Sequence, residues 1–136
     1  MISFQIQSKY RLANRSKIKV WLNNIIKEEG VKTGTITYLL INDKEMLVYN
    51  QQFLQHDTLT DVITFKNEDG NKISGDIVIS IERIYENAEK YKVLFTNELY
   101  RVMAHGLLHL LAYNDKSNKE AKEIRKKENY YLEKIS

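Results

Sequence analysis

The sequence predicts a single α/β (α+β) domain in which a mixed four-stranded sheet is covered by about five helices. Segments with helical periodicity alternate along the chain with short segments rich in β-branched and aromatic residues. The 136 residues are enough to bury one hydrophobic core. No repeat, linker or low-complexity stretch interrupts them, so residues 1–136 are expected to form one domain.

The first half of the chain alternates between strand and helix. Ser16 is expected to cap the first helix, and Gly30 follows its end, where glycine commonly terminates a helix. Asn42 and Glu45 form a capping-box pattern at the start of the second helix. The expected elements are a strand at 2–6, a helix at 16–29, a strand at 35–41 and a helix at 42–53.

Two strands and three helices are expected in the second half. The Asp69-Gly70 turn signal lies between the two strand segments, which predicts an antiparallel hairpin. Ser80, Thr96 and Ser117 are the expected helix caps. The helix after Thr96 is rich in leucine and is therefore expected to be largely buried. The strands are expected at 61–65 and 75–80, and the helices from 80 to 91, from 96 and from 117.

Composition excludes several classes of protein. The chain has no cysteine, which rules out disulfides and cysteine-ligated zinc and points to a reducing compartment. Its apolar runs are too short to cross a bilayer, and its first residues lack the pattern of a secretory signal. A cytoplasmic protein with no membrane partner is expected.

Basic residues are unevenly distributed, although the net charge is only +3. Residues 9–19 hold five basic side chains, including Arg11 and Arg15, and no acidic one, whereas 116–127 hold six basic and two acidic side chains. Such clusters either follow a phosphate backbone or form solvated helix faces. Charge alone favours the second interpretation.

A metal site is indicated by two of the three histidines. His105 and His109 are four residues apart in HGLLHL, so both imidazoles project from one helical face and can share an ion. Asp115 follows, with Asn114 placed to let the chain turn back in a left-handed conformation. Two histidines and an aspartate form a three-ligand zinc site, whose fourth position is left to a catalytic water. Hydrogen-bonded core histidines are the alternative.

The residue after His105 limits the chemistry. Gly106 occupies the place of the general-base glutamate in the H-E-x-x-H pattern of metalloproteases, so peptide hydrolysis by that mechanism lacks its proton acceptor. Activation of water and polarisation of an oxygen remain, and phosphodiester cleavage can use both. A zinc hydrolase for peptides or small molecules stays open but is disfavoured.

Three segments share a pattern with one known family: HGLLHLLAYND at 105–115, TDVITF at 60–65 and GDIVIS at 75–80. They resemble the H-G-x-L-H-L-x-G-Y-D-H, T-D-V-L-S-F and G-D-I-x-I-S signatures of the YbeY family of bacterial rRNA-maturation endoribonucleases. The order and position of the three segments match the family from about residue 20 to the end. Three signatures in register are more specific than any one of them.

The resemblance implies a zinc-dependent endoribonuclease that cleaves single-stranded RNA during maturation of small-subunit ribosomal RNA. It implies one zinc per chain, with His105 and His109 as ligands and Asp115 where the family has a third histidine. Ala112 replaces a family glycine. The implied partners are single-stranded or ribosomal RNA and the small ribosomal subunit or its proteins. A ribosome-associated binding factor with a structural or weakly catalytic zinc site is the alternative.

One departure from the family concerns the RNA phosphate. The family pattern N-x-x-Y-R has an arginine expected to meet the phosphate, but Phe53 and Leu54 stand at its last two positions here. Arg11 and Arg15 are candidate replacements for that cation. His56 is a third candidate, or an exposed loop histidine without this role.

Overall fold

The computed structural model describes residues 1–54 and 60–135, with the backbone alone at 53 and 54. Its described part confirms the predicted mixed four-stranded sheet, five α-helices and their order. None of the described helices is both long and apolar enough to cross a membrane. The elements are β1 (Ile2–Ile6), α1 (Arg15–Glu28), β2 (Lys32–Ile41), α2 (Asp43–Tyr49), the π-helical turn η1 (Asn50–Leu54), β3 (Val62–Asn67), β4 (Lys72–Ser80), α3 (Ile81–Tyr91), α4 (Phe95–Leu110) and α5 (Asn118–Leu132).

The sheet has the strand order β1-β2-β4-β3. The first three of these strands are parallel neighbours, and β3 runs antiparallel to β4, with Ile63 opposite Val78. The turn between β3 and β4 is closed by the Lys72 N–H, which donates to the Asp69 carbonyl at 3.0 Å. The predicted hairpin is therefore confirmed, and it makes β3 an edge strand.

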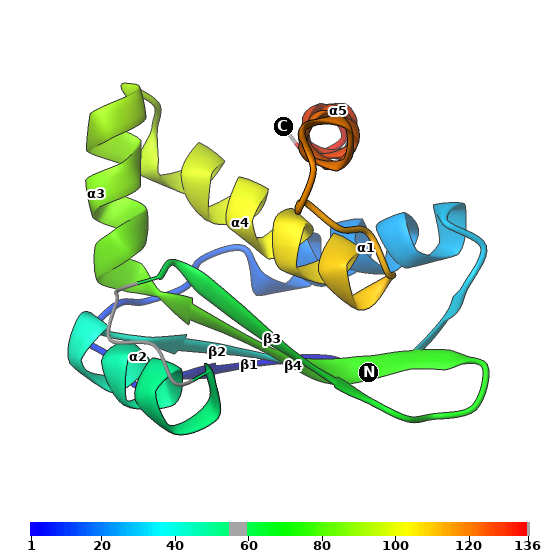
Figure 1. Cartoon of the computed structure of the whole chain (residues 1–136), viewed down its shortest axis with the longest axis horizontal. Helices are drawn as coiled ribbons and strands as arrows, with labels where there is room; N and C mark the ends of the chain where they lie inside the picture. Colours follow the sequence, from blue (N-terminus) through cyan, green and yellow to red (C-terminus); the bar gives the residue numbers. More distant parts are fainter. Residues whose placement is uncertain (55–59, 136) are drawn as a thin grey trace.

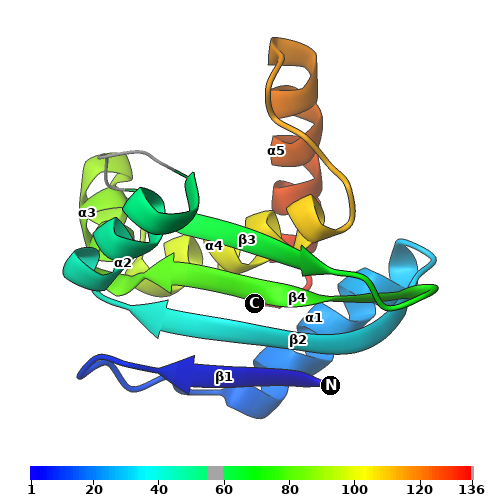
Figure 2. The same cartoon turned by 60° about the horizontal axis from the view of Figure 1, so that its bottom comes forward.

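Helices cover the two faces of the sheet unequally. Figure 1 shows α1 and α4 above one face and α5 above those two helices, while Figure 2 shows α2 over one end of the other face. Alternation along β4 explains this arrangement: Ile77 and Ile79 point into the main core, and Val78 joins a smaller cluster with Met46 of α2. The main core thus lies between the sheet and the α1–α4–α5 side.

The central helix of the main core is α4. Two buried polar side chains join these layers: Tyr38 of β2 donates its O–H to the Met103 carbonyl of α4 at 2.9 Å, and Trp21 of α1 donates its N–H to the Tyr131 carbonyl of α5 at 2.8 Å. The predicted burial of α4 is confirmed. Its buried residues are Glu98, Leu99, Val102, Met103, Ala104, Gly106, Leu107, Leu108 and Leu110.

Side-chain caps start three of the helices as predicted. Asn42, Ser80 and Ser117 each accept a hydrogen bond from the backbone N–H three residues further on. At Ser117 the capping box is complete, because the Glu120 carboxylate also accepts from the Ser117 N–H at 3.1 Å. These starts depend on local chemistry, which is why the sequence predicts them.

Two predicted caps are wrong. Ser16 and Thr96 each lie second in their helices, which are preceded instead by Asn14 and Leu94, neither of which makes a side-chain cap hydrogen bond. Tertiary contacts determine the start of α4, where the ring of Phe95 stacks on a tyrosine of α3 with 4.1 Å between centroids. The second helix is also shorter than predicted, because α2 gives way to the π-helical turn.

The end of α4 differs from the prediction as well. The Ala112 N–H donates to the His109 carbonyl and the Tyr113 N–H to the Leu108 carbonyl, both at 3.0 Å. This pair of bonds needs a left-handed residue, and Ala112 supplies it with φ of 76°. The turn was expected at Asn114, but the chain reverses two residues earlier, directly after the buried part of α4.

Replacing Ala112 by glycine is expected to stabilise the protein by about 1 kcal/mol, because a Cβ in the left-handed region costs roughly that much. Urea denaturation of both proteins measures the change in the free energy of unfolding. Gly30 ends α1 with the same pair of bonds, at φ of 80° and with open space around its missing Cβ. Gly30→Ala is therefore the reciprocal control and should destabilise by a similar amount. A less stable Ala112→Gly protein would contradict the argument.

Candidate metal centre

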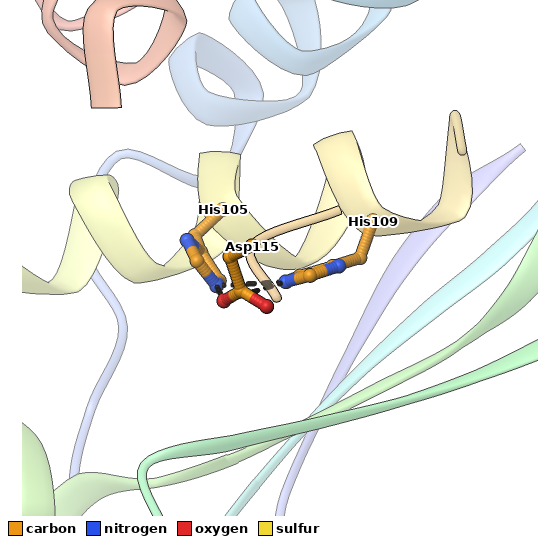
Figure 3. A group of neighbouring side chains, drawn as sticks. All are labelled: His105, His109 and Asp115. Atoms are coloured by element: carbon orange, nitrogen blue, oxygen red, sulfur yellow. Dashed lines mark hydrogen bonds and ion pairs between the residues drawn. The ribbon is translucent and has the colours of Figure 1, made fainter. Parts of the chain in front are cut away.

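Two histidines of α4 and an aspartate of the following loop converge on one point. His105 and His109 lie one helical turn apart, and the turn at Ala112 brings Asp115 back beside them (Figure 3). The two Nε2 atoms are 2.9 Å apart, and Asp115 Oδ2 lies 3.6 Å from Nε2 of His105 and 3.4 Å from Nε2 of His109. The three ligand atoms predicted from the sequence therefore face one another.

The spacing of these atoms fits a zinc ion. Ligands held 2.0–2.1 Å from a tetrahedral zinc lie about 3.3 Å from one another, close to the 2.9, 3.4 and 3.6 Å found here. Among the described residues, this is the only group of three or more histidine, cysteine and acidic side chains close enough to hold an ion. Imidazole nitrogen and carboxylate oxygen both suit zinc, so the donor set fits the metal that the sequence predicts.

Gly106 is explained by packing. A Cβ at this position would lie 2.7 Å from Cγ2 of Ile77 and 3.3 Å from Cγ2 of Val62. Both are methyl groups of stiff β-branched side chains on the sheet, so α4 can approach β3 and β4 this closely only with glycine. The position of the metalloprotease glutamate thus faces the sheet, away from the ligands.

His105 is held from behind by a residue that the sequence did not single out. Its Nδ1 lies 2.6 Å from Oε2 of Glu128, a carboxylate of α5 that is only 2% exposed. Glu128 shares the buried face of α5 with Ile124 and Tyr131, four residues before it and three after it. An acidic residue within this apolar pattern is the signal that would have identified it.

Two arginines pair with the other oxygen of the same carboxylate. Nη1 of Arg101 lies 3.3 Å and Nη1 of Arg125 lies 3.7 Å from Oε1 of Glu128. Arg101 also pairs with Glu98 at 3.7 Å, one turn further back along α4. A chain of charged groups therefore runs from α5 to His105.

Burial and charge change the protonation of the site. Burial lowers the pKa of His105, but the carboxylates of Glu128, Asp115 and Asp61 outweigh it, so this pKa lies above its usual value. Burial raises the pKa of Asp61, although the charge of His105 and backbone hydrogen bonds oppose it. The charged form of His105 carries a proton on Nε2 as well as on Nδ1, and a metal must displace the one on Nε2, so metal binding is expected to strengthen as the pH rises.

The loop that carries Asp115 is anchored by Glu29 at the end of α1. The Tyr113 hydroxyl donates to Oε1 of Glu29 at 2.6 Å, and both the Tyr131 hydroxyl and Nζ of Lys127, at 3.2 Å, donate to Oε2. Burial alone raises the pKa of Glu29, but these three hydrogen bonds outweigh it and hold the pKa below its usual value. One carboxylate thus ties the ligand loop to both α1 and α5.

Glu29→Gln is expected to lower the free energy of unfolding at neutral pH by about 1–3 kcal/mol, because it removes the charged acceptor of three donors. Since the folded pKa of Glu29 lies below the unfolded one, its contribution is present above the unfolded value and is lost as the pH falls through the folded value. Wild type and variant should therefore converge below a pH of about 4. Urea denaturation across this pH range tests both statements.

The neighbouring Glu28 supplies a matched control for that experiment. It is exposed, and its recorded partner is the hydroxyl of the half-exposed Tyr130. Glu28→Gln should change stability at neutral pH much less than Glu29→Gln. Equal effects of the two variants would show that the anchoring role of Glu29 is wrong.

The predicted phosphate-binding residues are not in contact with the metal ligands in the described part of the chain. Arg11 lies between β1 and α1, Arg15 begins α1, and both side chains are exposed. The ring of Tyr10, beside Arg11, packs on Phe95 at the start of α4. That point is about 15 Å along the helix axis from His105. His56 lies outside the described residues. These three assignments stay predictions.

The fold and the site together point to a class of protein: a mixed α/β domain with two histidines and an aspartate around one accessible point fits a metal-dependent hydrolase. A sequence model of the family described as Endoribonuclease YbeY matches residues 2–136. The chain therefore belongs to the YbeY family, as its three signature segments indicate.

Individual relatives agree with this assignment. The chain is similar to proteins described as Endoribonuclease YbeY from Flavobacterium johnsoniae, at 42% identity over 94% of this chain and 92% of the relative, and from Flavobacterium psychrophilum, at 44% over 97% and 94%. It also resembles a solution structure of a Thermotoga maritima protein. That similarity has a TM-score of 0.70 at 29% identity and covers 99% of this chain and 89% of the other.

Proposed function

We propose that this member of the YbeY family is a zinc-dependent endoribonuclease that cleaves single-stranded RNA during maturation of small-subunit ribosomal RNA. The names of its 42% and 44% identical relatives support hydrolysis of RNA phosphodiester bonds as the reaction. Ribosomal RNA and the small ribosomal subunit or its proteins are the proposed partners. The cytoplasm is the proposed compartment.

One observation carries this proposal: three ligand atoms converge at a place that solvent reaches. The side chains of His105 and His109 are each 24% exposed and that of Asp115 is 45% exposed. A catalytic zinc site needs three protein ligands and a free position, whereas a structural site is closed by a fourth protein ligand. The accessible side of the cluster supports the catalytic type.

Zinc in this position would supply a Lewis acid that polarises a phosphate oxygen and activates water for attack. The side chains of the protein would supply the metal ligands. His105 and His109 present their Nε2 atoms, and Asp115 presents a carboxylate oxygen on the exposed side. Because Gly106 faces the sheet, the helix contributes no general base at that position.

A second candidate is a ribosome-associated binding factor whose zinc is structural or weakly catalytic. Leu54 favours it, because this position of the family pattern usually holds the arginine that meets the phosphate. A structural site needs a fourth protein ligand. His56, outside the described residues, is the residue that could supply one. The two candidates therefore differ in whether the bound zinc drives RNA cleavage.

The experiment that separates them uses the purified full chain and an end-labelled single-stranded RNA oligonucleotide. Cleavage is expected for this RNA but not for DNA of the same sequence or for duplex RNA. A zinc chelator should abolish it, and added zinc should restore it. Stoichiometric zinc without cleavage would favour the binding factor, and cleavage that resists chelation would contradict the zinc-dependent mechanism.

Charge reversal of Arg11 and Arg15 to glutamate is expected to weaken RNA binding and flatten its salt dependence. Each phosphate contact on single-stranded nucleic acid contributes about 0.7 to the slope of log affinity against log salt concentration, so losing two contacts should reduce the slope by about 1.4. Both side chains are exposed, and the stretch 9–19 has no acidic residue to cancel its field. Fluorescence anisotropy with labelled RNA at several salt concentrations measures the slope.

The control reversal belongs on α5. Lys126 and Lys127 are the obvious pair, but Lys127 holds Glu29 and its reversal would disturb packing. Lys122 and Lys126 are both exposed and one turn apart, so they are the better control. Their reversal should change the slope less, because acidic side chains share this helix. Equal slopes for all variants would show that the phosphate-binding cations lie elsewhere.

A further inference from the structure

We propose that Glu128 is a positioning residue of the metal centre, which fixes the tautomer and the ring orientation of His105. This inference rests on the proposed zinc site. Glu128 contacts no proposed substrate group, and it acts through the 2.6 Å contact between its Oε2 and Nδ1 of His105. The two residues are 23 positions apart in the chain and meet because α5 packs on α4 above the sheet (Figure 1).

The contact determines where the imidazole proton resides. A neutral imidazole carries one N–H, and an ionised carboxylate can only accept a hydrogen bond. Nδ1 of His105 therefore holds the proton and donates it to Glu128, which leaves the lone pair of Nε2 free. Nε2 is the atom that faces His109 and Asp115, at 2.9 and 3.6 Å. The orientation that Glu128 imposes is the one that a metal requires.

The surroundings of Glu128 keep it an acceptor. Its carboxylate is almost fully buried, and such a charge is stable only when it is paired and hydrogen-bonded. Nη1 of Arg101 and Nη1 of Arg125 approach Oε1, at 3.3 and 3.7 Å, while Oε2 is left for His105. Oε1 thus pairs with the two guanidinium groups, and Oε2 pairs with the imidazole of His105.

Because the two oxygens of Glu128 have different partners, the effect of Glu128→Gln can be predicted. Arg101 can only donate hydrogen bonds, so in Glu128→Gln the amide oxygen is expected to turn toward the arginines. The amide nitrogen then faces Nδ1 of His105 and donates to it. That exchange moves the imidazole proton to Nε2, the atom needed for the metal, without changing the size of the buried side chain.

Two measurements test the inference on the full chain. Competition with a chromophoric chelator should show that Glu128→Gln binds zinc about 10- to 100-fold more weakly than wild type, the usual effect of losing such a partner. Proton–nitrogen correlation spectra of the histidine rings in metal-free protein, recorded at a pH where the imidazole of His105 is neutral, should show His105 protonated on Nδ1 in wild type and on Nε2 in the variant. Thermal unfolding of the metal-free proteins measures any loss of fold stability separately.

Glu98→Gln is the matched control. Glu98 is also a buried acid that pairs with Arg101, at 3.7 Å, but the structure records no bond from it to a ligand within the described residues. It should leave the zinc affinity and the His105 tautomer unchanged. If Glu128→Gln does not fold, Glu128→Asp replaces it: this variant keeps the charge but shortens the reach to His105, and a smaller loss of affinity is expected.

The outcomes separate this inference from the proposed function. Weaker zinc binding together with the shifted proton supports a positioning role. A loss of stability with unchanged zinc affinity and an unchanged tautomer would reduce Glu128 to a structural residue and overturn the inference. Wild-type protein that binds no zinc would overturn the proposed function, and the spectra of the metal-free protein would still decide whether Glu128 sets the His105 tautomer.

Discussion

Replacing His109 by alanine is expected to reduce bound zinc from about one ion per chain to nearly none, because two ligands no longer form a three-point site. RNA cleavage should fall with it by about 10³-fold or more, the rate equivalent of losing several kcal/mol of Lewis-acid stabilisation. The fold is expected to survive, since the side chain is 24% exposed and lies at the end of α4. Metal analysis of the purified protein and the RNA cleavage assay measure the two effects.

His56 offers a histidine control for this experiment. His56→Ala should retain zinc if the ligands are His105, His109 and Asp115. Loss of zinc from His56→Ala would instead indicate a fourth ligand and favour a structural site. Retention of stoichiometric zinc by the His105→Ala/His109→Ala double variant would eliminate the site altogether.

Substitution of Asp115 is expected to have the second largest effect. Asp115→Ala removes the proposed carboxylate ligand and should weaken zinc binding by about 100-fold or more. The loss of a residue that only orients a ligand already weakens binding by up to about 100-fold. Asp115→His should restore binding, because it recreates the all-histidine set of the family signature. The side chain is 45% exposed, so an imidazole has room to adjust. Chelator competition on the three proteins tests the order of affinities.

Asn114→Ala is the matched control for Asp115, since Asn114 is the adjacent exposed residue of the same loop. Its zinc affinity should equal that of wild type. If neither Asp115 variant changes the affinity, the third ligand lies elsewhere, and His56 becomes the residue to test.

The spacing of residues along the chain was enough to predict the order of the elements and the convergence of His105, His109 and Asp115. Alternation in β1 and helical periodicity in α1 and α4 are local properties, and so are the caps at Ser80 and Ser117. His105 and His109 are neighbours on any helix, and Asp115 follows the end of that helix closely. These three positions can therefore be predicted from residues close together in the sequence, without knowledge of tertiary contacts.

Boundaries and turns depended on packing. Helix α4 starts before its predicted cap because Phe95 is held by aromatic rings from α3 and from the loop after β1. It ends at Leu110, its last buried residue, and the chain reverses at Ala112, although alanine is a poor choice for a φ of 76°. Residue preferences at these positions are worth about 1 kcal/mol or less, and tertiary contacts outweigh them.

The contacts that hold His105 and the loop of Asp115 in place depend on tertiary structure. Glu128 reaches His105 from 23 residues away, and the Glu29 carboxylate holds Tyr113 from 84 residues away. In the sequence Glu128 stands out only as an acidic residue on an apolar helix face, and Glu29 only as the residue after the end of α1. Neither position tells which distant side chain the carboxylate meets. Only the docking of α5 on α4, and of the loop that carries Asp115 on the end of α1, determines which donors meet these two carboxylates. The sequence by itself was enough to predict that His105, His109 and Asp115 converge, because one helix and the loop directly after it bring them together, whereas the carboxylates that contact His105 and Tyr113 come from separate helices that meet only when the core is packed.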